Sequence, residues 1–186
     1  MPRSGNPFVN TIVLVLAVAR RARFRVALIG GFALPFYGVQ RATGDVDFLV
    51  DAGGSDALHD ALLAAGARCL HRSADAANYA TGSSRLAPVD FIVARRARAR
   101  KMLERTRSRL LRAARLRVPV VDAEALIGLK LQALANQPRR TQDAADIQAL
   151  FAARWKSLNV DIFRDHYRIF DREHDLDRLL AEARKR

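Results

Sequence analysis

Residues 30–47 begin with a glycine pair and end with two closely spaced carboxylates, and they constrain the fold more than any other stretch. Gly30 and Gly31 follow a short apolar run that is typical of a buried strand. Asp45 and Asp47 stand two residues apart and lead into a second apolar run. Because side chains alternate along a strand, these two carboxylates point to the same face. Like charges so placed repel each other, so the stretch predicts a site for a positive ion beside a glycine turn.

The glycine pair is suited to a phosphate group. Glycine lacks a Cβ atom, so its backbone can adopt positive φ and let phosphate oxygens approach the main chain. A helix that begins there would add free N–H groups and a dipole, both of which favour an anion. Paired carboxylates suit Mg²⁺, which takes a few hard oxygen ligands from a protein and completes its shell with water and substrate phosphates. The combination indicates metal-assisted phosphoryl or nucleotidyl transfer.

A family resemblance follows from the order of these residues. Residues 30–47 read Gly-Gly-x-Ala-x-x-x-Tyr-Gly-x-x-Arg-x-Thr-x-Asp-Val-Asp, which resembles the signature of the DNA polymerase β-like nucleotidyltransferase superfamily. Within it, the pattern is most similar to the small bacterial AbiEii-like enzymes of toxin–antitoxin and phage-defence systems. The segment 88–93 resembles the strand that carries the family's third carboxylate, here Asp90. The segments 126–130 and 139–147 resemble its helical Lys…Asp-Ile motif.

The resemblance implies a Mg²⁺-dependent nucleotidyltransferase, with Mn²⁺ as an alternative ion, that moves a nucleoside monophosphate from an NTP to an acceptor hydroxyl. The implied metal ligands are Asp45, Asp47 and Asp90, and these residues with Asp146 are the implied catalytic carboxylates. The implied nucleotide contacts are Gly30, Gly31, Arg41, Thr43 and Lys130. The wider superfamily often has serine in place of Gly31, so backbone amides must serve here as the phosphate donors.

Four of these residues have structural alternatives. Arg41 and Thr43 could each stabilise the loop through a hydrogen bond. Lys130 lies in an apolar helical stretch and could pack its stem while its ammonium group reaches solvent. Asp146, like Asp143, could pair with nearby arginines and with the dipole at the start of a helix.

The chain of 186 residues is long enough for one domain with an appended helical part. We expect an α/β fold of the α+β kind, with a small mixed sheet flanked by helices and a helical C-terminal half. Residues 1–120 would form the nucleotidyltransferase core, and residues 121–186 would pack on it as a helical part. The expected strands are 25–30, 45–50 and 89–93, with two shorter strands within 67–85. The expected helices include 8–22, one from the glycine pair to about Gly38, 57–65, 122–135 and one beginning at Thr141.

The formal net charge of +13 is concentrated in residues 95–117, which hold eleven Lys or Arg against one acid, Glu104. Met102, Leu103, Leu110 and Leu111 interleave at helical spacing, which predicts one or two amphipathic helices with a basic outer face. Such a surface is either an ordinary solvated face rich in arginine or an RNA-binding face.

The N-terminal apolar run, residues 11–19, is too short to span a bilayer and predicts an amphipathic helix packed on the sheet. A secretory signal is disfavoured because Arg3 alone supplies its basic region and cleavage would leave arginines leading into the first strand. A single cysteine, Cys69, fits a reducing compartment. We therefore expect a cytoplasmic protein with no membrane partner.

Two functions compete on this evidence. The first is an enzyme that binds an NTP and modifies an RNA 3′ end such as that of tRNA; a protein side chain or a small molecule such as an aminoglycoside are alternative acceptors, and an antitoxin is a candidate partner. The second is a catalytically inactive module of the same fold that binds nucleic acid or acts as an antitoxin. A Rossmann dinucleotide site is excluded, because no Gly-x-Gly-x-x-Gly follows the first strand.

Overall fold

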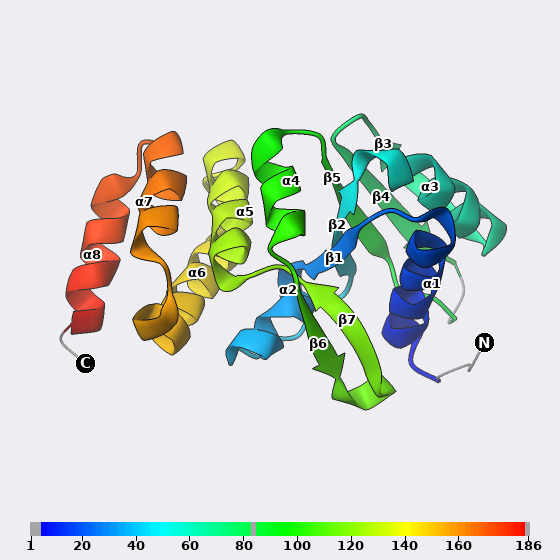
Figure 1. Cartoon of the computed structure of the whole chain (residues 1–186), viewed down its shortest axis with the longest axis horizontal. Coiled ribbons are helices and arrows are strands. Elements are labelled where there is room, and N and C mark those ends of the chain that lie inside the picture. The colour runs from blue at the N-terminus through cyan, green and yellow to red at the C-terminus, as the bar shows by residue number, and fades with distance from the viewer. Residues whose placement is uncertain (1–4, 83–84, 185–186) are drawn as a thin grey trace. The chain divides into compact units, whose positions relative to one another are not determined.

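A computed structural model describes residues 5–82 and 85–184 (Figure 1). The chain forms two compact units. The first unit extends to Ala33 and resumes from Ala42 to Val121, whereas the second combines Leu34–Arg41 with the chain from Asp122 onward. In the described part of the chain, seven strands and eight α-helices give the mixed α/β architecture that the sequence predicts. No helix there is both long and apolar enough to cross a membrane.

The first unit is built on one mixed sheet with the strand order β3-β4-β5-β2-β1-β7-β6. The strands are β1 (Val26–Ile29), β2 (Val46–Asp51), β3 (Ala67–Arg72), β4 (Ala76–Thr81), β5 (Val89–Ala94), β6 (Arg107–Leu111) and β7 (Leu116–Val120). The β2–β5 and β1–β7 pairs are parallel, and the other neighbouring strands are antiparallel. The strands expected at the centre of the sheet are therefore confirmed, as is the pair of short strands within residues 67–85.

The central strand β2 is buried on both faces. Val46, Phe48 and Leu49 are fully buried, although Leu49 points to the opposite face from the other two. The ring of Phe48 stacks on that of Phe91 in β5, with 6.2 Å between ring centroids. This packing helps to hold β2 and β5 side by side.

Four helices belong to the first unit: α1 (Pro7–Ala22), α2 (Gly30–Ala33), α3 (Ser55–Ala64) and α4 (Ala97–Glu104). The Asn6 side chain accepts hydrogen bonds from the backbone N–H groups of Phe8 and Val9 and so caps α1. Helix α1 ends where Arg23 adopts a left-handed conformation. It packs against α3 and β2, as the sequence predicts for its apolar face.

The basic segment 95–117 differs from its prediction. Its α-helix is α4 alone, and residues 107–120 form the antiparallel β6–β7 hairpin with a 3₁₀ turn, Arg112–Ala114, at its tip. One amphipathic helix is thus confirmed, with Met102 and Leu103 buried. The prediction was wrong for residues 107–117 because Val118 and Val120 alternate inward on β7, and Val120 pairs with Leu28 of β1. That pairing draws β6 into the sheet as its last strand, despite the helical spacing of the leucines.

The second unit is helical. It contains the 3₁₀ turn η1 (Leu34–Tyr37) and the helices α5 (Ala123–Asn136), α6 (Thr141–Arg154), α7 (Val160–Ile169) and α8 (Glu173–Arg184). The expected single helix from the glycine pair to Gly38 is thus split into α2 and η1, and η1 packs against α6. Asp122 caps α5 by accepting from the N–H of Ala125 at 2.8 Å. Helices α5 and α7 approach closely at Gly128, where a Cβ atom would lie 2.6 Å from the His166 ring.

Candidate metal and nucleotide site

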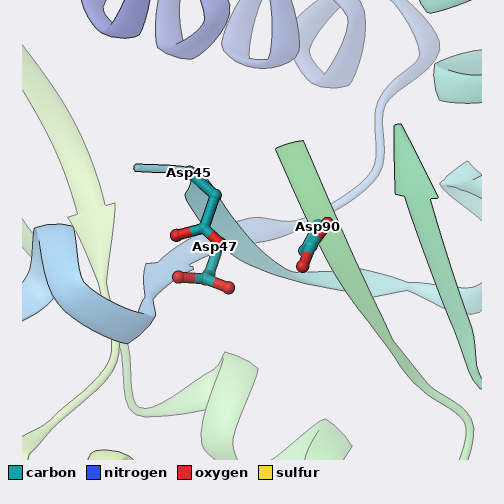
Figure 2. A group of neighbouring side chains, drawn as sticks. All are labelled: Asp45, Asp47 and Asp90. Carbon is teal, nitrogen blue, oxygen red and sulfur yellow. The ribbon is translucent and has the colours of Figure 1, made fainter. Parts of the chain in front are cut away.

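Three carboxylates gather where β2 and its neighbour β5 begin (Figure 2). Asp47 lies on β2 and pairs in register with Asp90 on the parallel strand β5. Asp45 comes just before β2, two residues from Asp47 and therefore on the same side. Each of the three offers one oxygen atom, and these atoms all lie within 4.8 Å of one another. We call Asp45, Asp47 and Asp90 the acidic cluster; no other group of three such ligands comes together in the described residues.

The acidic cluster carries an unfavourable charge distribution. Burial raises the pKa of Asp90, a hydrogen bond from Asn78 on β4 opposes that rise, and the nearby charge of Asp45 adds to it. All three side chains are half-buried, so solvent screens their repulsion only in part. A divalent cation would offset both the burial of these carboxylates and their mutual repulsion. A set of ligands made only of oxygen atoms suits Mg²⁺ or Mn²⁺.

The backbone of Gly30 touches the acidic cluster. Gly30 has a φ of +60°, which only glycine adopts readily, and a Cβ atom there would lie 1.9 Å from Oδ2 of Asp47. Both observations require glycine, and together they place the turn between β1 and α2 directly against a carboxylate of the cluster.

Gly31 is required for a different reason. A Cβ atom on Gly31 would lie 2.7 Å from both Cβ and Oγ1 of Thr43. Any serine at position 31 would meet the same collision, which explains why the Gly-Ser form of the motif does not occur in this chain. The Thr43 hydroxyl in turn donates a hydrogen bond to Oδ1 of Asp45 at 2.9 Å. Thr43 therefore orients one carboxylate of the cluster, and its contact with a nucleotide stays a prediction.

The other predicted site residues lie in the second unit, in a connected set of ion pairs. Lys130 on α5 is only 7% exposed, and its Nζ donates to Oδ1 of Asp143 at 3.0 Å and to Oδ2 of Asp146 at 2.5 Å. The Nε of Arg41 lies 3.2 Å from the same Asp146 oxygen. Arg140 donates from Nε to Oδ2 of Asp143 at 2.5 Å. We call Arg41, Lys130, Arg140, Asp143 and Asp146 the buried ion network, because Lys130 and both aspartates are buried, although Arg140 is exposed.

Asp146 pairs with two of these cations, Lys130 and Arg41. Burial alone would raise the pKa of Asp146, but hydrogen bonds and charge from Lys130, with contributions from Gln142 and Arg41, outweigh it and hold that pKa below its ordinary value. Asp146 is therefore an ionised carboxylate that holds two cations.

Sequence reasoning missed the partners of Lys130. A signal was present, because Asp143 and Asp146 stand three residues apart on a helix and so present two carboxylates on one face. A lysine within the apolar run of α5 needs such partners if it is buried. Pairing with Arg140 is confirmed for Asp143, whereas Asp146 pairs with Lys130 and Arg41.

Comparison with known proteins gives the fold. No family model and no curated protein matches the sequence. Among solved structures, the antibiotic-resistance factor ANT(2″)-Ia in solution is similar, with a TM-score of 0.66 and 17% identity over 94% of this chain and 97% of that chain. A crystal structure of ANT(2″)-Ia in complex with adenylyl-2″-tobramycin gives 0.64 and 16% identity, with 89% and 98% covered. The lincosamide antibiotic adenylyltransferase LnuA, with lincomycin bound, gives 0.56 and 13%, with 83% and 99% covered. The chain therefore has the nucleotidyltransferase fold.

Proposed function

We propose that the protein is a metal-dependent nucleotidyltransferase that moves a nucleoside monophosphate from an NTP to an acceptor hydroxyl and releases pyrophosphate. The observation that carries the proposal is the acidic cluster, whose three oxygens lie within 4.8 Å beside a turn where only glycine fits. The fold agrees, because it is shared with an adenylyltransferase.

The acidic cluster fits a divalent ion by its donor set, since each carboxylate supplies a hard oxygen. Such an ion, once bound, would neutralise phosphate charge and lower the pKa of the acceptor hydroxyl. Thr43 holds Asp45 in place through its hydrogen bond. The backbone N–H groups of the glycine pair would donate hydrogen bonds to phosphate oxygens. Asp90, whose pKa burial raises, is the residue that we assign to accept the proton of the acceptor hydroxyl.

We further propose that the buried ion network supports nucleotide binding. Lys130 and Arg41 carry cationic donors, which form strong hydrogen bonds to phosphate oxygens, and both would contact the triphosphate. Asp146 would act in this scheme by holding both cations in position. This assignment differs from that of a catalytic base, because an aspartate with a lowered pKa is a poor proton acceptor.

For the acceptor, we propose an RNA 3′ end, such as that of tRNA, in a cytoplasmic toxin–antitoxin or defence system with a cognate antitoxin. The second candidate is a hydroxyl of a small antibiotic. ANT(2″)-Ia and LnuA favour it, since their structures contain adenylyl-2″-tobramycin and lincomycin, respectively.

A labelling experiment tests the proposal. The protein is incubated with each α-labelled NTP, Mg²⁺ or Mn²⁺, and either total RNA or an aminoglycoside and lincosamide mixture. We expect metal-dependent transfer of label by wild type and its loss in Asp45→Asn. Asp51→Asn is the matched control, because Asp51 ends the same strand but lies outside the acidic cluster and pairs with Arg25 at 3.7 Å. Equal labelling by Asp45→Asn and wild type, or no label with any metal and acceptor, would refute the enzyme and favour an inactive binding module.

A further inference from the structure

The β6–β7 hairpin concentrates positive charge at one edge of the sheet. Five exposed arginines lie on it, and we call them the arginine hairpin: Arg107, Arg109, Arg112, Arg115 and Arg117. Residues 105–121 contain no Asp or Glu. In Figure 1 the hairpin, with β6 in darker and β7 in lighter green, extends downward from the level of β1 to its turn. The hairpin therefore contains no acidic residue that could balance the charge of its five arginines.

The register shows how these charges are distributed. Arg107 and Arg109 lie opposite Val120 and Val118, whereas Arg117 lies opposite Leu110. Side chains alternate between faces, so Arg107 and Arg109 share one face, about 6.8 Å apart along the strand, and Arg117 lies on the other. Two further arginines occupy the turn, where Arg115 adopts a φ of 48°. The charge therefore surrounds the edge of the sheet on both faces and at the tip.

Protection of the sheet edge does not explain this density. Strand β6 is the last strand of the sheet, and one or two inserted charges are enough to discourage pairing with another chain. Five arginines within eleven residues exceed that number. Arginine is the side chain best suited to contact phosphate through two parallel hydrogen bonds. The charge therefore points to a polyanion rather than to edge protection.

The composition of the hairpin also favours base-paired over single-stranded nucleic acid. Residues 105–121 include no Phe, Tyr, Trp or His, so no ring is available to stack on an unpaired base. Binding of single strands without sequence preference relies on such stacking, whereas contacts to phosphates position a protein on a base-paired stem. We propose that the arginine hairpin binds the phosphate backbone of a base-paired nucleic acid without reading its sequence. This proposal rests on the proposed function in one respect, because the arginine hairpin would hold the base-paired stem of the RNA acceptor that is modified.

Binding can be measured without NTP or metal, so the two proposals fail separately. Fluorescence anisotropy follows labelled RNA and DNA stem-loops of unrelated sequence, single-stranded oligouridine, and poly-glutamate as a competitor. The test variant is Arg107→Gln/Arg109→Gln/Arg117→Gln. The control Arg68→Gln/Arg154→Gln/Arg164→Gln removes the same charge from exposed arginines elsewhere. All six side chains are exposed, and thermal unfolding checks that each variant is folded.

We expect wild type and the control to bind stem-loops of either type, with little dependence on sequence. If three phosphate contacts are lost, the slope of log affinity against log salt falls by about 2.7, so wild type loses about 40-fold more affinity than the test variant between 50 and 200 mM salt. Asp45→Asn should bind as wild type does. Equal weakening of both triple variants, tighter binding of oligouridine than of stem-loops, or effective competition by poly-glutamate would each overturn the proposal.

Discussion

Replacement of Lys130 by methionine tests the buried ion network. Methionine keeps much of the length of lysine but removes the ammonium group. The change leaves two carboxylates without their shared cation, and their side chains are only 9% and 3% exposed, at Asp143 and Asp146 respectively. Breaking a buried pair by removing one partner is strongly destabilising, because the remaining charge stays buried.

The expected loss of stability is about 3 kcal/mol, the lower end of the range for a broken buried pair. The lower end applies because Asp146 keeps Arg41 at 3.2 Å and Asp143 keeps Arg140 at 2.5 Å. For a chain of this size the loss corresponds to a fall in melting temperature of about 6–12 °C.

Urea unfolding followed by circular dichroism measures this loss for Lys130→Met. Lys101→Met is the matched control, because Lys101 is an exposed lysine on α4 and its replacement should change stability by at most about 0.5 kcal/mol. A Lys130→Met variant within about 1 kcal/mol of wild type would refute the reasoning, since it would mean that Asp143 and Asp146 need no cation from α5.

Four other measurements follow from the geometry. Gly30→Ala should lower the free energy of unfolding by about 1–2 kcal/mol because of the positive φ alone. It should also weaken Mn²⁺ binding, because the added Cβ would displace the Asp47 carboxylate, and a Mn²⁺ titration with wild-type affinity would contradict this. Gly128→Ala should cost about 1–3 kcal/mol in urea unfolding, because its Cβ would lie 2.6 Å from the His166 ring, and an unchanged midpoint would disprove the close contact. The pKa of Asp146 is lower in the folded protein than the value of about 3.9 expected when unfolded, so its stabilisation is present above about pH 4 and is lost as pH falls through the folded pKa. Asp146→Asn should therefore flatten the free energy of unfolding against pH below about pH 4, and an unchanged curve would count against the ion pairs. Mn²⁺ at ten times its dissociation constant should raise the free energy of unfolding by about 1.4 kcal/mol in wild type, and no shift would argue against a metal site.

Much of the sheet was predictable because its strands carry strong local patterns. The apolar runs that lead into Gly30 and out of Asp47 are short, bounded by turn residues and rich in β-branched side chains, as buried strands are. Asp90 was expected only from the family resemblance, and the parallel pairing of β2 and β5 brings it into register with Asp47. Their role as metal ligands stays a prediction.

The β6–β7 hairpin was not predictable from local pattern. Arg107, Arg109 and Leu110 show no alternation of apolar and polar residues, because both faces of an edge strand can be exposed to solvent. What forms the strand is its pairing with β7, and that in turn depends on the distant strand β1. Tertiary pairing of this kind overrides a local helical period.

The buried ion network could not be predicted from the sequence for a related reason. Lys130 and its carboxylates are separated by 13 and 16 residues, and Arg41 lies 105 residues from Asp146. Spacing along one helix predicts which residues share a face, but only the packing of α5, α6 and η1 decides that these faces meet. The collision of a Gly31 side chain with Thr43 belongs to the same class of long-range fact.

The most direct test of the central claim is a Mn²⁺ titration of the acidic cluster, followed by electron paramagnetic resonance. The titration compares wild type with Asp47→Asn and with the control Asp51→Asn. The account predicts saturable binding to wild type and to Asp51→Asn, and binding weakened at least about tenfold in Asp47→Asn, because a ligand oxygen loses its charge. Equal binding by all three proteins, or no saturable binding by wild type, would contradict it.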